Sequence, residues 1–451
     1  MTRSLTLAVL AAALVSVTPP RARADEPSIP RRAVPDYDGR AEAGPSAEEA
    51  LVWIPRVLLW PLHAIVEFVL RRPLGWLLTT AEHERWDVLQ IPPFVETAPT
   101  WGLTPTVFVD FGFQPSGGVY VWANDVLFEG NDLRAQLGFG GVDWLRATLT
   151  DRVRLGPNAQ VELSGEGWAR PDHVFMGSGP DARADRVARY GRRRLGGRVT
   201  AVYRPWRASQ IRVTAGVRAN ELYDTTYLDD GQRTLSDAAQ SGWLGERGAS
   251  AASLTSYTSY WQRLDIAIDT REPHPANGSG VRVEAHGELA LDVFRPLELR
   301  WARWGGAAGA FWDVDAGRTL GVWVAAELAS ALGTEPVPFT ELPDFGARGR
   351  MSGFRNGWIV GESVISATLE YRYPIWVSVE GLVHVSIGNA FGSEFEGFDM
   401  ARMRMSYAFG LRTIGDPDQA LTIQAGCGTE TFERGGGVVV YRLTVGMQEG
   451  F

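Results

Sequence analysis

Apolar and polar residues alternate through most of the chain from about residue 99 onward. In residues 281–293 the odd positions are Val, Val, Ala, Gly, Leu, Leu and Val, and every even position except Ala290 is polar. The same period recurs in residues 320–328, 365–373 and 439–447. Because successive side chains of a strand point to opposite faces, this pattern predicts many β-strands with one apolar and one polar face.

The N-terminal part follows other patterns. Residues 1–24 combine Arg3, a short apolar core and the sequence Ala22-Arg23-Ala24, which predicts a cleaved secretory signal peptide. Residues 25–50 are Pro-rich, polar and charged, which predicts a disordered leader.

Residues 51–98 predict an amphipathic helical segment followed by a Pro-containing connector. Apolar residues recur at helical spacing from Leu58 to Val69. Arg56 and Glu67 disfavour a membrane-spanning helix, since a charge at its centre costs about 2.5–3.5 kcal/mol. We expect the segment to lie on a surface, with a spanning helix as the alternative.

Composition and export decide which β-protein the alternation describes. The chain has 51 Gly and 17 Trp, and many predicted strands carry Tyr or Trp near their ends. Export, more than ten strands and aromatic strand ends are together typical of outer-membrane barrels. Hydrocarbon offers open strand edges no partner, so the sheet must close. We expect an all-β fold, a transmembrane antiparallel β-barrel of sixteen strands over residues 99–451, with a soluble β-sandwich as the alternative.

Charge and chemistry exclude several classes of protein. The 44 basic residues, all Arg, and 53 acidic residues give a net charge of −9, which argues against nucleic-acid binding. Cys427 is the single cysteine, so a disulfide within the chain and a Cys-cluster metal site are excluded. The scattered histidines match no metalloprotease motif, and no G-x-S-x-G or phosphate-loop motif occurs. We expect no enzyme activity, cofactor or metal.

Four motifs are more specific than alternation. They are FGARGRMSGF (345–354), preceded by PFTELPD and followed by EYRYPIW (370–376); DTREPHPANGSG (269–280); FMGSGPD (175–181); and GNAF (388–391). In this order they resemble motifs of the bacterial surface antigen superfamily, which contains the BamA- and TamA-like assembly barrels and the two-partner-secretion transporters. The resemblance implies that the sixth loop folds back into the barrel lumen.

The resemblance also assigns roles to individual residues. The loop tip comprises Gly346, Arg350, Ser352, Gly353, Phe354 and Arg355; its lumenal partners are Glu370, Arg372, Ser386 and Gly388; the turn motif comprises Asp269, Thr270, Arg271, Pro275 and Gly278; and a C-terminal assembly signal comprises Tyr441, Leu443, Val445 and Phe451. The signal implies that the chain is a client of the barrel-assembly machinery.

Two departures from the family pattern concern the loop tip. The tip arginine of the family falls at Ser352, and its acidic partner falls at Ser386. Losing both members of a buried pair can be nearly neutral, whereas losing one strands a charge. We expect the loop still to be tucked inside, with Arg350 or Arg355 as the substitute charge; the alternative is a looser loop.

Function is expected from the resemblance. Residues 25–98 show no strand pattern, so we expect no POTRA modules and infer that a separate periplasmic partner would supply substrate capture. The first hypothesis is insertion or translocation of proteins at the outer membrane of a Gram-negative bacterium, through a weak seam between residues 104–113 and 438–447. The alternative is a passive pore or structural barrel that has lost translocation. The run Arg192–Arg194 is either lumen wall or a contact for lipopolysaccharide phosphates, because guanidinium groups pair well with phosphate.

Overall fold

The structure is a computed structural model that describes residues 100–244, 256–272, 278–315, 317–346, 350–376, 379–414 and 421–447. The expected signal peptide, leader and helical segment lie outside these residues, as do Pro275 and Phe451. No helix in the described ranges is long and apolar enough to cross a membrane.

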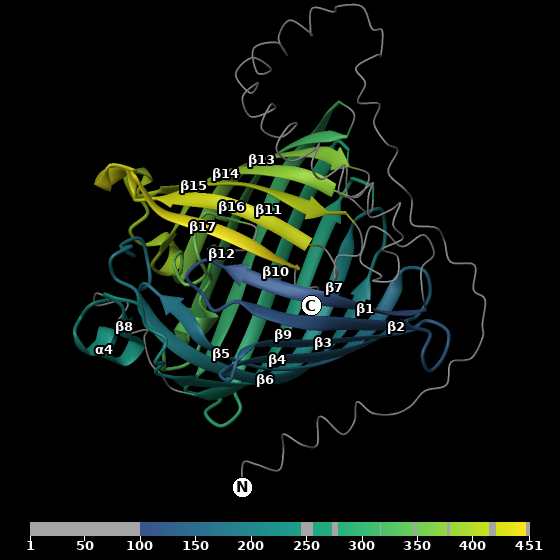
Figure 1. The fold of residues 1–451 in the computed structure, drawn as a ribbon, viewed down its shortest axis with the longest axis horizontal. Helices are drawn as coiled ribbons and strands as arrows, with labels where there is room; N and C mark the ends of the chain where they lie inside the picture. Colours follow the sequence, from purple (N-terminus) through teal and green to yellow (C-terminus); the bar gives the residue numbers. More distant parts are fainter. Residues whose placement is uncertain are drawn as a thin grey trace, which may run out of the picture.

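Sixteen strands of the described residues form a closed antiparallel barrel, which confirms the predicted fold class. Each strand pairs with the next one along the chain, and β1 pairs with β17 to close the sheet (Figure 1). The strands are β1 (Trp101–Asp110), β2 (Ser116–Asn124), β3 (Asn131–Gly141), β4 (Trp144–Arg154), β5 (Ala159–Phe175), β6 (Ala188–Tyr203), β7 (Gln210–Tyr223), β9 (Tyr257–Asp269), β10 (Gly280–Asp292), β11 (Arg300–Asp315), β12 (Arg318–Ala331), β13 (Ser363–Trp376), β14 (Val379–Phe391), β15 (Arg404–Thr413), β16 (Leu421–Thr429) and β17 (Val438–Met447).

The remaining elements are short. A two-residue strand, β8 (Arg233–Thr234), pairs in parallel with β6. The helical elements are α4 (Leu235–Gln240), η3 (Phe339–Glu341), η4 (Ser393–Phe395), η5 (Met400–Arg402) and η7 (Phe432–Arg434).

Connections differ in length between the two ends of the barrel. At one end, residues 316–317 join β11 to β12 and residues 377–378 join β13 to β14. At the other end, residues 224–256 join β7 to β9 and residues 332–362 join β12 to β13. We call these the turn end and the loop end; α4 and β8 mark the loop end in Figure 1. In outer-membrane barrels the short turns face the periplasm.

Alternation along each strand becomes an apolar outside and a polar inside. In β10, Val283 and Leu289 are 47% and 60% exposed on the outer face, whereas Glu288 and Asp292 are 2% and 1% exposed inside. The other predicted stretches behave alike, with Val322 and Val324 of β12 outward. The outer face is therefore a continuous apolar belt, as lipid requires.

The interior is packed rather than empty. One apolar cluster lies around Trp301 and Phe339, and a second lies around Met351 and Phe354. Both clusters combine inward-facing strand residues with residues of the 332–362 connection. The long connection between β12 and β13 thus supplies much of the core.

We predict that Val324→Arg destabilises the barrel in lipid. Val324 is outward-facing near the middle of β12, so arginine there should reduce the free energy of unfolding in a bilayer by about 2–4 kcal/mol. Denaturant titration of the barrel in liposomes measures this, with Val324→Leu as the control. A change within about 0.5 kcal/mol, as expected at a water-exposed position, would contradict a lipid-facing belt.

Candidate functional site

The connection of residues 332–362 enters the barrel instead of projecting from it. Its side chains Phe339, Met351, Phe354 and Ile359 are at most 4% exposed. We call these residues, described except for 347–349, the lumenal loop. The candidate functional site consists of this loop and the β1–β17 junction, which we call the seam.

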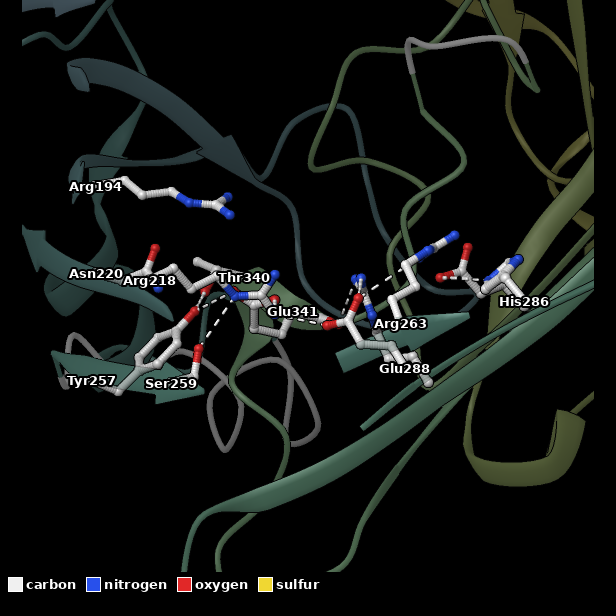
Figure 2. A network of polar contacts seen from close by, with 12 residues as sticks. Arg194, Arg218, Asn220, Tyr257, Ser259, Arg263, His286, Glu288, Thr340 and Glu341 are labelled. Carbon is white, nitrogen blue, oxygen red and sulfur yellow. Dashed lines mark hydrogen bonds and ion pairs between the residues drawn. The ribbon is translucent and has the colours of Figure 1, made fainter. Parts of the chain in front are cut away.

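Glu341 anchors the start of the lumenal loop. η3 places its carboxylate among basic groups of the barrel wall, with Oε2 at 2.7 Å from Nη2 of Arg218 and Oε1 at 3.3 Å from Nη2 of Arg192. The hydroxyl of Tyr257 donates to Oε1 at 2.6 Å. Figure 2 shows Glu341 enclosed by residues from several strands. A side chain of the loop therefore completes a charge network of the wall.

Glu288 extends this network along the wall. It accepts from Nη2 of Arg218 at 2.8 Å and from Nη2 of Arg303 at 2.7 Å, and Arg263 lies at 3.7 Å (Figure 2). Arg303 also donates to the backbone oxygen of Glu341 at 3.3 Å. Because buried charges are tolerated only when paired, the loop and strands β6, β7, β9, β10 and β11 depend on one another electrostatically.

Charge pairing controls the ionisation of Glu341, which lies on the loop and outside the spanning strands. Burial by itself raises the pKa of this carboxyl group. The guanidinium groups of Arg218, Arg192 and Arg303 outweigh burial and lower the pKa to about 2. Glu341 is therefore a carboxylate at neutral pH.

Asp344 shapes the next part of the loop. Its Oδ1 accepts from the backbone N–H of Gly346 at 2.8 Å, and its Oδ2 accepts from that of Gly357 at 2.6 Å. Burial raises the pKa of Asp344 to about 7, although these two N–H donors act in the opposite direction. The carboxyl group joins the two arms of the loop around the tip.

The FMGSGPD motif binds the returning arm of the loop. The N–H of Met176 donates to the oxygen of Gly357 at 3.1 Å, and that of Gly179 donates to the oxygen of Val360 at 2.8 Å. A Cβ at Gly357 would lie 1.9 Å from the oxygen of Val174, so the close approach requires glycine. The backbone of this motif thus binds the backbone of the returning arm of the loop.

The tip lies against strands β14 to β16. The N–H of Gly353 donates to Oγ of Ser406 at 2.8 Å, and a Cβ at Gly353 would lie 2.1 Å from the oxygen of Cys427. Phe354 is fully buried, and its ring occupies the space where a Cβ of Gly428 would be. The glycines therefore let backbone and ring approach without a gap.

Ser352 and Ser386 hold different positions in this arrangement. Ser352 is 4% exposed, and its backbone oxygen accepts from Nη1 of Arg442 at 3.2 Å. The hydroxyl of Ser386 instead lies 3.0 Å from that of Thr368 on the neighbouring strand. Gly388 underlies the tip: a Cβ there would lie 2.9 Å from the sulfur of Met351.

The charged residues of the tip reach the opposite wall. Arg350 donates to Oε1 of Glu284 at 2.7 Å and lies 4.5 Å from the Trp323 ring centre. Gly346, another tip residue, has its backbone against Arg355: a Cβ there would lie 2.1 Å from the Arg355 oxygen. Arg350 therefore carries a charged contact to the barrel wall in a tip that has serine at 352.

The predicted partners Glu370 and Arg372 form a cluster of their own. Arg372 donates to Oε1 of Glu370, and Nε2 of His384 lies 2.8 Å from Oε2. With Arg350 and Glu284 they border a cavity of about 190 Å³ beside the tip. The cavity is lined mainly by charged groups, so it can hold water and small ions.

The DTR motif ends β9 at the turn end. Oδ1 and Oδ2 of Asp269 accept from Nε of Arg271 at 3.0 Å and from Nη2 at 2.8 Å. Oγ1 of Thr270 accepts from the N–H of Val281 at 2.8 Å. Gly278 has φ +90°, a conformation that favours glycine. The motif therefore builds a turn and its cap, and its Arg271 lines the same cavity as Arg350 of the tip.

Among the described residues the seam is short. Within them β1 and β17 share three residue pairs, against eight between β1 and β2 and nine between β16 and β17. The N–H of Phe111 adds one bond to the oxygen of Leu443 at 3.2 Å. Pro105 lies on the β17 side of β1 and has no N–H, so it cannot donate a backbone bond toward β17. The seam is therefore narrower than the expected pairing of residues 104–113 with 438–447.

A buried ion pair closes the seam from inside. Nε of Arg442 on β17 donates to Oδ1 of Asp110 on β1 at 3.1 Å, and Nη2 donates to Oδ2 at 2.9 Å. The two residues are 8% and 5% exposed. Tyr441, by contrast, points outward and is 75% exposed. Two-point pairing fixes the relative position of the two strands.

Residues 192–194 are barrel wall. Arg192 faces inward to Glu341, and Arg194 faces inward with Nε at 3.0 Å from Glu166. Arg193 faces outward, where it pairs with Glu221 at 3.0 Å. Only one member of the run is therefore directed at surrounding lipid.

Several of these residues escaped the sequence analysis. Glu341 stands in the PFTELPD segment, and Arg218, Glu288 and Arg303 stand at inward-facing positions of predicted strands. The sequence did offer one signal for the strand residues: they are charged and stand at the positions that alternate with the apolar, outward-facing ones. Which inward charges meet depends on closure of the barrel, and so does the pairing of Asp110 with Arg442, 332 residues apart.

No group of His, Cys, Asp and Glu in the described ranges is arranged to hold a metal ion. The arrangement that the structure does show is mechanical: a plugged lumen, a loop held by charges and close backbone contacts, and a narrow seam.

Comparisons with known proteins concern the fold. The crystal structure of BamA from Haemophilus ducreyi lacking POTRA domains 1–3 matches 82% of this chain and 78% of that chain, with a TM-score of 0.52 and 14% identity. This chain has the BamA-like barrel fold. CdiB from Acinetobacter baumannii and CdiB from Escherichia coli are also similar, at 10% and 13% identity and a TM-score of 0.48 each, with 60% and 64% of those chains covered. No family model and no curated protein matches the sequence.

We predict that Glu341→Gln loosens the lumenal loop. The change removes a buried carboxylate from Arg192 and from Arg218, of which Arg218 keeps Glu288 as a partner. Breaking a buried pair costs about 3–5 kcal/mol. Denaturant titration and heat-resistant gel mobility measure the loss. Glu335→Gln is the matched control in the same loop, because the Glu335–Arg295 pair has the same 2.7 Å separation but is more exposed and should contribute at most about 1 kcal/mol. Equal effects of both variants would contradict the anchoring role.

We further predict that the difference in stability between wild type and Glu341→Gln depends on pH. The folded-state pKa of Glu341 is lowered from 4.5 to about 2, so the stabilisation should be complete above pH 4.5 and disappear as pH falls through about 2. Unfolding titrations of both proteins at a series of acidic pH values measure the difference. A difference that stays constant down to pH 2 would show that charge pairing is not its source.

Proposed function

We propose that this chain is a BamA- and TamA-like barrel of the Gram-negative outer membrane that takes part in inserting or translocating proteins, together with a separate periplasmic partner. The seam carries this proposal. In the described part of the chain, three residue pairs join β1 to β17, so opening there disrupts fewer of the described backbone bonds than opening at either neighbouring junction. A gap at this position would face both lipid and lumen.

The lumenal loop supports the same proposal. Its apolar clusters and its charge network fill the lumen at the loop end, so substrate could not simply diffuse through. An opening between strands, with the loop as a plug, suits chains that must pass from the barrel into the bilayer. The BamA-like fold agrees with this reading.

The outer belt and the two ends of the barrel suggest where lipid, lipopolysaccharide and the periplasmic partner would bind. The apolar outer belt would contact lipid, and Arg193 with Glu221 on the outside would lie near lipopolysaccharide at the loop end. The periplasmic partner would bind at the turn end, where the described chain begins at residue 100. Service by the barrel-assembly machinery rests on the C-terminal signal, whose last residue lies outside the described ranges.

We predict that locking the seam abolishes function. Phe108 pairs with Gly446 across it, and a Cβ at Gly446 would lie 3.6 Å from Cα of Phe108, which suits a disulfide once the ring is removed. Phe108→Cys with Gly446→Cys, in a Cys427→Ala background, should slow the appearance of newly made outer-membrane proteins in the source bacterium, and reductant should restore it. Pulse-labelling after depletion of the wild-type chain measures this.

A second disulfide provides the control. Thr150 and Ser164 face each other across β4 and β5 with hydroxyls 3.0 Å apart, so Thr150→Cys with Ser164→Cys adds a lock away from the seam. It should leave the rate unchanged. Normal rates with the seam oxidised would overturn lateral opening and favour the alternative, a passive or structural barrel.

A further inference from the structure

The tip of the lumenal loop lies across the seam. On the β17 side, the oxygen of Ser352 accepts from Nη1 of Arg442. On the β1 side, the guanidinium of Arg355 lies against Gly112 in the turn after β1: a Cβ at Gly112 would lie 2.6 Å from Nη1 of Arg355. The same guanidinium lies 5.8 Å from the centre of the Phe113 ring. Residues 352–355 thus contact β17 and the turn that follows β1.

Arg442 bonds both the opposite strand of the seam and the tip of the lumenal loop. Its Nε and Nη2 hold Asp110 across the seam, while its Nη1 holds the tip. Arg442 is 8% exposed, so water cannot readily replace either partner. Since the group is planar and its donors have fixed directions, a shift of β17 away from β1 changes its geometry toward the tip.

We propose that Arg442 is the coupling residue between the lumenal loop and the seam: the tip acts as a strap that holds β1 to β17, and the seam opens when the strap is released. The proposal deepens the proposed function and rests on it for the role of seam opening. Reciprocity follows, because a tip held by the closed seam must loosen when the seam opens.

Excimer fluorescence of pyrene on Val109→Cys and Val445→Cys reports seam closure in the purified full chain in liposomes. These residues are paired across the seam and face outward, and a Cys427→Ala background removes the native thiol. Arg442→Gln should increase the open population about fivefold or more, the lower range for coupled sites. Arg412→Gln is the matched control, since Arg412 pairs with Glu380 on the lumen wall away from the strap.

The strap is tested from the loop side by Ser406→Ala. This variant removes the bond to the N–H of Gly353 and touches neither seam strand. It should also open the seam, and Ser406→Ala with Arg442→Gln should open it no further than Arg442→Gln alone. Conversely, Arg442→Gln should speed maleimide labelling of Met351→Cys, a position that is fully buried.

Two results would overturn the coupling. One is a released tip, seen as faster labelling of Met351→Cys in Ser406→Ala, with a seam that remains as closed as in wild type. The other is equal opening by Arg412→Gln and Arg442→Gln. Because no substrate is present, the outcome is independent of the seam-lock experiment, which tests whether opening serves insertion at all.

Discussion

Hydrocarbon offers no hydrogen-bond partner to a peptide group, and the architecture of this protein depends on that constraint. A sheet in lipid must satisfy every strand edge, so β17 has to meet β1. Over the described residues the closure consists of three residue pairs and one further backbone bond. Pro105 has no N–H to donate from that edge of β1. The barrel is thus sealed everywhere, yet held least firmly at one junction.

Ion pairs join the lumenal loop to the strands inside the barrel, as backbone hydrogen bonds join the strands to one another in its wall. Burying a carboxylate or a guanidinium is unfavourable unless it is paired, and the alternating strands direct many such groups inward. Glu341 and Glu288 share Arg192, Arg218 and Arg303 among them. Since one of the acids lies on the lumenal loop, removing the loop would take the carboxylate of Glu341 from Arg192 and leave Glu288 as the acid shared by Arg218 and Arg303. The plug is therefore retained by the electrostatics of the wall.

Close backbone contact holds the tip, which has serine at position 352. Gly353 against the oxygen of Cys427, and Phe354 against Gly428, leave no room for a Cβ. The charged contacts come from elsewhere: Arg350 reaches Glu284 from the tip, and Arg442 reaches the Ser352 oxygen from β17. Glycine contacts and a strand arginine can thus hold a loop tip whose residue 352 carries no charge.

The sequence by itself determined the strands and their inward and outward faces, because a two-residue period is read from neighbouring residues. It also determined the closed barrel, because strands with an apolar outer face in lipid cannot leave an edge unpaired. It also placed Gly353 and Phe354 in a loop with a definite resemblance. It could not determine that Glu341 meets Arg218, or that Asp110 meets Arg442, because partners from distant strands come together only through closure and register. Tertiary structure alone decided which inward charges pair, how few bonds close the seam and where the loop tip lies against it.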